Sequence, residues 1–254
     1  MLIWDEKKPR ADSDQLKLLY HVKLKDKVLT KVFKEDSVAQ LESGWHDSAL
    51  ESIINIVRAP DGDFESIGNL ANTVADLHSL QKIIELLHST PQGKQAFERR
   101  SRLGDIDLQK LYRLPPNTLG YAYAEHLLKN NLQPLHSGQV ENDYQFLGAH
   151  ITETHDIWHI ITGCDTNILG EIQLEAFYVA QLHFSRFWLA LLAKNLVKAA
   201  IYDIEVSTKY MDAITKGWLM GKQSVPLFGI EWNSLWSKPL ENVRSDLNII
   251  LCET

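Results

Sequence analysis

The feature that most constrains the fold of this chain is a helical repeat of apolar residues with almost no competing strand pattern. Within residues 66–88 the apolar side chains recur at steps of three and four, at Ile67, Leu70, Val74, Leu77, Leu80, Ile84 and Leu87. That spacing places them on one face of an α-helix. The alternation that marks a half-buried strand has a single weak candidate, at residues 23–33. The pattern predicts an all-α protein.

The same reasoning divides the chain into an arm and one domain. Residues 1–60 are polar and irregularly patterned, so we expect a variable N-terminal arm followed by one helical domain over residues 61–254. Pro91 favours a helix start, and Gly221 with Pro226 soon after it is a stop signal that ends a later helix. The expected helices cover residues 66–88, a segment from 91, 117–130, 140–161, 168–200 with a bend near Ser185, 202–221, and a last segment beyond Pro239.

Charge and cysteine content exclude several classes of function. The chain has 26 basic and 33 acidic residues and a net charge of −7, which argues against binding nucleic acid through phosphate contacts. Its two cysteines are too few for a disulfide scaffold or a four-cysteine zinc site. The first ten residues hold no apolar core of a signal peptide. Uncharged stretches fall short of the roughly 18 residues that a spanning helix needs. We expect a cytoplasmic protein, peripheral to the inner face of a membrane.

One segment has the residue types of a metal site. On a helix, His155 and His159 stand one turn apart on the same face, and Asp156 lies about 60° around the axis from His159. A turn-rich stretch, residues 162–167, then leads into a helix with Glu171 near its start. An antiparallel helical hairpin would bring Glu171 back across from the histidines. Two imidazoles with one or two carboxylates suit Zn²⁺, Mn²⁺ or Fe²⁺.

Two other interpretations of these residues stay open. Paired histidines with an adjacent Asp also occur as a hydrogen-bonded surface pair. The segment is partly similar to the HExxH helix of zinc proteases, but Asp156 is one methylene shorter than the glutamate that acts there as general base.

The spacing His155-Asp156-x-x-His159, eleven residues and Glu171 resembles the HDxxH-x11-E motif of the ubiquinone (coenzyme Q) biosynthesis protein four family. Flanking segments of about residues 85–250 are similar to further family motifs. These are Thr90-Pro91-Gln92-Gly93, the LPPNTLG segment at 114–120, the NILGE segment at 167–171, and Trp218, Gly221, Ile230-Glu231-Trp232, Pro239-Leu240 and Val243-Arg244. One departure is His150-Ile151, where family members usually have Arg-Tyr.

The resemblance implies an all-helical protein of quinone biosynthesis with a divalent metal (Zn, Mg, Mn or Fe) at His155, Asp156, His159 and Glu171. These four would also be the catalytic residues. The family is associated with oxidative removal of the C1 carboxyl from a polyprenylated hydroxybenzoate, and also with organising other quinone-biosynthesis enzymes into a complex. Enzyme and scaffold therefore both stand as hypotheses, and a metal-dependent hydrolase is a third.

Two further predictions concern the helix that carries Glu171. Glu175, one turn further on, is expected to orient an imidazole from outside the ligand set, or else to lie on a solvated face. The helix is apolar on nearly every side, which predicts a groove for an isoprenoid tail. A core helix or a homodimer interface explains the same pattern equally well. The groove residues are Ile172, Phe177, Val179, Phe184, Phe187, Trp188 and Leu191.

Overall fold

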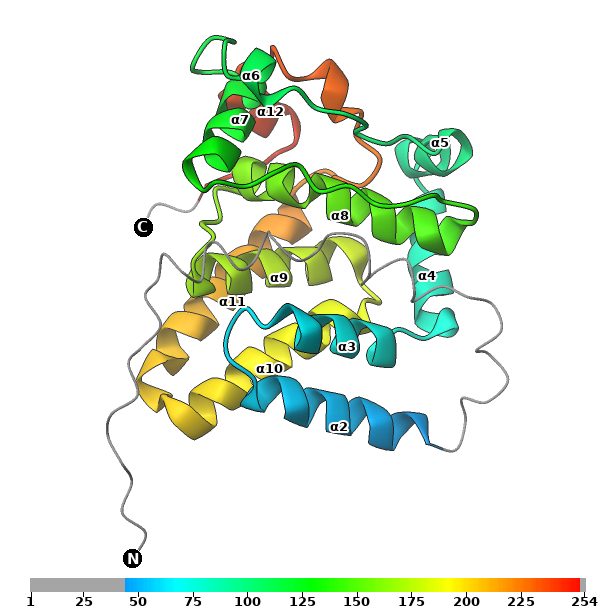
Figure 1. Cartoon of the computed structure of the whole chain (residues 1–254), viewed down its shortest axis with the longest axis vertical. Coiled ribbons are helices and arrows are strands. Elements are labelled where there is room, and N and C mark those ends of the chain that lie inside the picture. The colour runs from blue at the N-terminus through cyan, green and yellow to red at the C-terminus, as the bar shows by residue number, and fades with distance from the viewer. Residues whose placement is uncertain (1–43, 252–254) are drawn as a thin grey trace, which may run out of the picture.

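The computed structural model describes residues 44–251, and within that range the protein is helical. No β-strand occurs in this part of the chain, where a single isolated bridge joins Thr118 and Pro239. The predicted all-α fold is confirmed. The helices, shown in Figure 1, are α2 (Trp45–Arg58), α3 (Phe64–Val74), α4 (Leu77–His88), α5 (Pro91–Arg99), α6 (Leu108–Leu111), α7 (Leu119–Lys129), α8 (Asp143–Thr162), α9 (Ile168–Leu182), α10 (Arg186–Tyr202), α11 (Ser207–Gln223) and α12 (Leu240–Asp246), with short 3₁₀ turns η2 (Ile204–Val206) and η3 (Trp232–Ser234).

The helical domain begins earlier than the expected boundary at residue 60. Helix α2 packs on α3 and α10, and Ala49 and Ile56 join Leu70, Val74 and Leu191 in one buried cluster. The predicted arm therefore contributes a helix to the domain. The rest of that arm, residues 1–43, lies outside the described residues, as does the weak strand candidate at 23–33.

The prediction of one helix over residues 66–88 is wrong, because the chain forms α3 and α4 with a break at residues 75 and 76. The side chain of Asp76 accepts hydrogen bonds from the backbone N–H and the hydroxyl of Ser79, at 3.1 and 2.6 Å. This N-cap starts a new helix although the apolar repeat continues through the break.

The longest predicted helix, over residues 168–200, is likewise two helices. The expected bend near Ser185 is a full break, in which His183 adopts a positive φ of 56° and Ser185 caps α10 through the backbone N–H of Trp188. Helix α11 starts at Ser207 rather than at residue 202. Gly221, the expected stop signal, lies inside α11.

Helix α9 occupies the centre of the domain in Figure 1, with α8 above it and α10 below it, while α11 rises from the lower left and crosses α9. Helix α11 packs along α9. A Cβ atom on Gly217 would lie 1.9 Å from the carbonyl oxygen of Gln173, so only glycine permits this approach of the two backbones. The packing therefore buries α9 on several sides.

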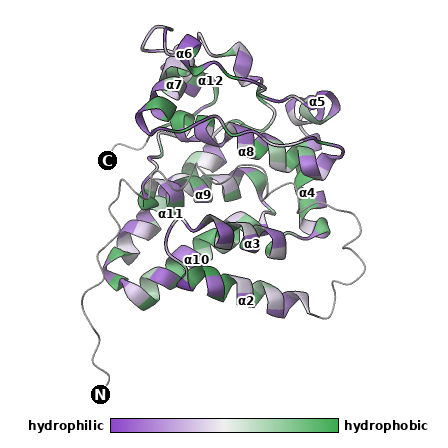
Figure 2. Cartoon of the chain, viewed as in Figure 1, coloured by the Kyte–Doolittle hydropathy of each residue, from purple (hydrophilic) through white to green (hydrophobic). Residues whose placement is uncertain are grey.

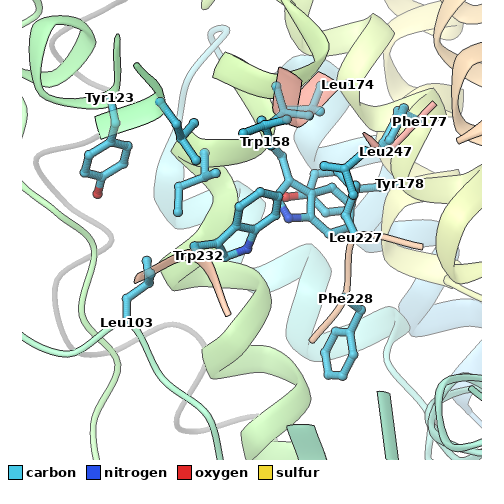
Figure 3. Packing of buried hydrophobic residues seen from close by; sticks show 14 of the residues in the cluster. Leu103, Tyr123, Trp158, Leu174, Phe177, Tyr178, Leu227, Phe228, Trp232 and Leu247 are labelled. Atoms are coloured by element: carbon cyan, nitrogen blue, oxygen red, sulfur yellow. The ribbon is translucent and has the colours of Figure 1, made fainter. Parts of the chain in front are cut away.

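The main core lies around α8 and α9. Trp158, Phe177, Tyr178, Phe228 and Trp232 are among its largest fully buried side chains, and Figure 3 shows them together. None of the helices in the described range combines the length and the apolar character needed to cross a membrane.

Candidate metal centre

The two predicted histidine ligands face each other on α8. The Nε2 atoms of His155 and His159 lie 3.2 Å apart, and the two rings meet edge to face with centroids 4.7 Å apart. The helix is held at its C-terminal end by Arg244, whose Nε and Nη2 donate to the carbonyls of Ile161 and Ile160 at 3.0 and 2.7 Å. This contact fixes the end of α8 that carries the pair.

Glu171 joins the two histidines from α9. The short connection after Gly163 leads to Asn167, whose side chain caps α9 by accepting from the backbone N–H groups of Leu169 and Gly170. Glu171 then lies in the first turn, with its Oε1 atom 3.4 Å from Nε2 of His159. One ligand atom from each of His155, His159 and Glu171 lies within 4.8 Å of the others. The hairpin brings the three side chains together as expected.

Asp156, the fourth predicted ligand, lies outside this group of three. It is buried on α8, and its negative charge acts on the pKa values of His159 and Glu171. The structure therefore places Asp156 beside the candidate centre as an acidic neighbour.

Hydrogen bonding decides which nitrogen of His159 can bind a cation. Its Nδ1–H donates to the backbone carbonyl of Cys164 at 2.9 Å. Because a carbonyl only accepts, the neutral ring must carry its lone pair on Nε2, which faces His155 and Glu171. Burial, and then the neighbouring His155, lowers the pKa of His159 well below 6.5, so the ring stays neutral.

The carboxyl group of Glu171 is buried, which disfavours its charged form. Glu171 is 6% exposed, and its Oε1 makes no hydrogen bond within the described part of the chain. Burial, then the charges of Glu175 and Asp156, raises the pKa of Glu171 well above 4.5. The carboxylate is thus electrostatically unfavourable until a proton or a cation compensates it.

Glu175 does not have the position that its predicted role requires. Its Oε2 accepts a hydrogen bond from Nδ2 of Asn195 at 2.8 Å, which links α9 to α10 instead of orienting an imidazole. Burial raises the pKa of Glu175 to about 7, against the lowering effects of Lys194 and Asn195. Lys194 is itself buried and is the nearby positive charge that acts on both Glu171 and Glu175.

Sequence reasoning missed two side chains at the centre. The hydroxyl of Tyr178, on α9, lies 3.2 Å from Nδ1 of His155. The ring of His126, on α7, stacks near that of His159 with centroids 6.3 Å apart. Tyr178 follows Glu171 by seven residues, or two turns of α9, and this spacing on one face was the only local signal. The position of His126 depends on how α7 packs and has no local signal.

The seven residues predicted to line an isoprenoid groove are, apart from Phe184, distributed over several clusters in the part of the chain that the structure describes. Of these, Ile172, Phe177 and Leu191 are buried in three separate apolar clusters, because α10 folds back beside α9 after the break at residue 183. Phe184 is 45% exposed at that break. Val179, Phe187 and Trp188 are partly buried at the edges of the clusters. Among the described residues, one cavity of about 530 Å³ lies between α4 and the start of α8, and another of about 260 Å³ lies between α2 and α3. The seven residues are not among those that line these two cavities.

His150, at the position of the departure from the family pattern, has a structural role. Its Nδ1–H donates to the carbonyl of Ser101 at 3.2 Å, and its Nε2 accepts from the backbone N–H of Gly229 at 3.0 Å. The bond that Nε2 accepts needs the neutral ring, because both nitrogens of a protonated imidazole are donors. Burial lowers the pKa of His150 to about 4, which keeps the ring neutral at pH 7.

The donor set fits a divalent metal. Two imidazole nitrogens and a carboxylate oxygen converge in a buried place, and nitrogen and oxygen ligands in this ratio are typical of zinc, iron and manganese sites. His155, His159 and Glu171 could therefore hold such an ion.

Comparison with known proteins points to one family. The sequence profile described as "Coenzyme Q (ubiquinone) biosynthesis protein Coq4" matches residues 42–253. A relative from Anopheles gambiae, named "Ubiquinone biosynthesis protein COQ4 homolog, mitochondrial", is 26% identical over 68% of this chain and 62% of its own length. The "Ubiquinone biosynthesis protein COQ4, mitochondrial" of Uncinocarpus reesii is 26% identical over 80% of this chain and 72% of its own. The crystal structure of a "Putative ubiquinone biosynthesis protein" from Nostoc punctiforme is similar with a TM-score of 0.71 and 25% identity, over 80% of this chain and 97% of that one.

The alignment to the first of these relatives thus spans less than two thirds of that protein. The profile nevertheless covers most of the chain described here, including all of α2 to α12. The chain belongs to the coenzyme Q (ubiquinone) biosynthesis protein Coq4 family.

Proposed function

We propose that this protein acts in coenzyme Q biosynthesis as a metal-dependent enzyme that removes the C1 carboxyl from a polyprenylated hydroxybenzoate. The observation that supports it best is that one ligand atom from each of His155, His159 and Glu171 lies within 4.8 Å of the others. The lone pair of His159 is fixed on Nε2, the atom that lies 3.2 Å from His155 Nε2 and 3.4 Å from Glu171 Oε1. Family membership supports the pathway.

Each residue has a role in this proposal. His155, His159 and Glu171 hold the metal, and Asp156 supplies further negative charge beside it. When bound, a divalent metal polarises a ring oxygen of the substrate as a Lewis acid and so favours loss of CO₂. The carbonyl of Cys164 keeps His159 in the tautomer that presents Nε2. His159, Glu171 and Asp156 are buried, which would limit the access of water to the centre. In the overall oxidative reaction the C1–carboxyl bond breaks and CO₂ leaves, while a C1–hydroxyl bond forms with oxygen from water. The two electrons that the ring loses would reduce dioxygen, the external oxidant, to hydrogen peroxide.

The apolar tail of a prenylated substrate would favour a membrane, and exposed apolar side chains on this protein suit contact with one. Helices α10 and α11 meet at η2, at the lower left of Figure 1, and α10 is strongly apolar in Figure 2. Ile201, Tyr202 and Ile204 at this junction are 61%, 61% and 65% exposed. Further exposed apolar side chains lie along the two helices at Leu189, Leu196, Val197, Met211, Trp218 and Leu219. We propose that this face rests on the bilayer.

The same exposed face supports the alternative function, a non-catalytic scaffold that binds an isoprenoid lipid and presents it to other quinone-biosynthesis enzymes. An apolar area of this kind is typical of a contact surface for a membrane or for another protein. In the scaffold, the metal would contribute to stability and no bond of the substrate would change.

Metal binding is tested first by titration. After treatment with a chelator, the protein is titrated with Zn²⁺ or Mn²⁺, and bound metal is measured by mass spectrometry. We expect one ion per chain in the wild type and a loss of affinity of at least 10-fold in His159→Gln. His136→Gln, which changes an exposed histidine in the loop before α8, is the matched control. Equal metal content in His159→Gln and the control would refute the site.

Catalysis is tested with a polyprenylated hydroxybenzoate labelled with ¹³C at the carboxyl. The enzyme hypothesis predicts labelled CO₂ from the wild type and His136→Gln but not from His159→Gln. The scaffold hypothesis predicts no labelled CO₂ from any of them, together with an isoprenoid lipid that co-purifies with all three proteins and is identified by mass spectrometry.

A further inference from the structure

The two imidazoles of the candidate metal centre are supported by unlike partners. Nδ1 of His159 meets the carbonyl of Cys164, whereas Nδ1 of His155 meets the hydroxyl of Tyr178 at 3.2 Å. A carbonyl only accepts hydrogen bonds, but a hydroxyl can donate or accept. The partner of His159 therefore permits one tautomer, and the partner of His155 permits both.

This difference matters because the two Nε2 atoms lie only 3.2 Å apart. Since Nε2 of His159 carries a lone pair, the contact is a hydrogen bond only if Nε2 of His155 carries a proton. In the metal-free protein, Nδ1 of His155 then has a lone pair and accepts from the Tyr178 hydroxyl. If both Nε2 atoms bind a cation, neither can carry a proton. The proton of His155 would then be on Nδ1, which would donate a hydrogen bond to the hydroxyl oxygen of Tyr178.

The surroundings of Tyr178 hold its hydroxyl in place for both arrangements. The tyrosine ring is fully buried and stacks between two tryptophans. Its centroid lies 4.3 Å from that of Trp158, at 11° between the ring planes, and 4.1 Å from that of Trp188, at 4°. Figure 3 shows Tyr178 and Trp158 within the packed core. The hydroxyl proton can rotate while the oxygen stays fixed.

We propose that Tyr178 is a positioning residue of the metal centre, which pairs with His155 in both tautomers and so allows His155 to release Nε2 to a cation. The proposal rests on the metal binding proposed above. It assigns to Tyr178, seven residues beyond Glu171, the orienting role that the sequence suggested for Glu175. Partners of this kind typically change metal affinity by 10- to 100-fold when removed.

The test compares Tyr178→Phe with Tyr123→Phe, using Co²⁺ as the probe. Both tyrosines are fully buried, but the hydroxyl of Tyr123 has no hydrogen-bond partner within residues 44–251. Phenylalanine keeps the ring and its stacking in each. We expect Tyr178→Phe to bind Co²⁺ 10- to 100-fold more weakly, with altered visible absorption bands, while Tyr123→Phe matches the wild type. The thermal midpoint without metal serves as the measure of structural damage.

A second measurement addresses the tautomer directly in the unmodified protein. Long-range ¹H–¹⁵N NMR correlations distinguish a protonated from an unprotonated ring nitrogen. Nδ1 of His155 should be unprotonated without metal and protonated after addition of Zn²⁺, while His159 keeps its proton on Nδ1 throughout. This readout needs no variant, so it holds even if Tyr178→Phe folds poorly.

The outcomes separate this inference from the proposed function. If the wild type binds neither Co²⁺ nor Zn²⁺, the metal centre is refuted and this inference with it. If the wild type binds metal but Tyr178→Phe has the same affinity and spectrum, or Nδ1 of His155 does not change on Zn²⁺ binding, the role of Tyr178 alone is overturned.

Discussion

Replacement of Glu171 by glutamine should change the stability of this protein in opposite directions with and without metal. In the metal-free protein, Oε1 of Glu171 is buried without a hydrogen bond and lies 3.4 Å from the lone pair of His159 Nε2. A glutamine side-chain amide can place an N–H donor there. Since a buried unsatisfied polar group costs about 1–3 kcal/mol, Glu171→Gln should stabilise the metal-free protein by an amount in this range.

The sign of the pH dependence follows from the raised pKa of Glu171. The folded state binds this proton more tightly than the unfolded chain. The stability that the group contributes is therefore fully present below about pH 4.5 and is lost as the pH rises through the folded-state pKa. The advantage of Glu171→Gln should be small near pH 5 and larger at pH 8.

With metal, the order reverses. A ligand at 100 times its dissociation constant stabilises the folded state by about 2.7 kcal/mol, which for a domain of this size raises the melting temperature by roughly 5–10 °C. The wild type should show this increase on addition of Zn²⁺, and Glu171→Gln should show almost none.

Differential scanning calorimetry measures the melting temperature of each protein in four conditions, at pH 5 and pH 8 with and without Zn²⁺. Glu98→Gln, which neutralises an exposed glutamate on α5, is the matched control and should behave as the wild type. The reasoning is refuted if Glu171→Gln is less stable than the wild type without metal, or if both gain the same amount from Zn²⁺.

Two further predictions concern the scaffold around the site. Because the pKa of His150 is lowered from 6.5 to about 4, protonation of this residue should remove about 3 kcal/mol of folding stability as the pH falls from 6.5 to 4. The free energy of unfolding, measured with urea at each pH, should therefore fall by about 3 kcal/mol less over this range in His150→Gln than in the wild type. An equal fall in both proteins would contradict the assignment. Gly217→Ala should destabilise the protein by at least about 2 kcal/mol, because its Cβ would lie 1.9 Å from the carbonyl of Gln173. Gly44→Ala, whose Cβ meets nothing within 4 Å, should stay within about 0.5 kcal/mol of the wild type in the same unfolding assay.

The apolar repeat is a better predictor of which segments are helical than of where each helix ends. The repeat runs through residues 66–88 without interruption because α3 and α4 both bury an apolar face. The break depends on one side chain, Asp76, that caps α4, and the same holds for Ser185 at the start of α10. Both caps are visible in the sequence as an Asp or Ser before an apolar run, and they outweigh the periodicity.

The part of the candidate site formed by residues close in the sequence could be predicted. His155, His159 and Glu171 lie within seventeen residues joined by one turn, so helix geometry alone brings them together. Tyr178 and His126 reach the site through the packing of α9 and α7, which no local pattern specifies. The groove stays a prediction, since a helix that is apolar on all sides is equally suited to a lipid and to the neighbouring helices that pack on α9 here.

The two buried glutamates of α9 differ in their partners, and this difference favours a metal centre over a purely structural network. Burial of an ion costs several kcal/mol unless partners compensate it. Glu175 has such partners, in Asn195 and the charge of Lys194. Glu171, one turn earlier, has no hydrogen bond to Oε1 within the described residues and faces a histidine that burial keeps neutral. A protein selected for stability alone gains nothing from this arrangement, whereas a cation among the three side chains would satisfy the carboxylate and both lone pairs at once. The buried Oε1 of Glu171 without a hydrogen bond therefore supports the proposed metal centre. Calorimetry of Glu171→Gln tests whether a cation, rather than a proton alone, compensates this carboxylate.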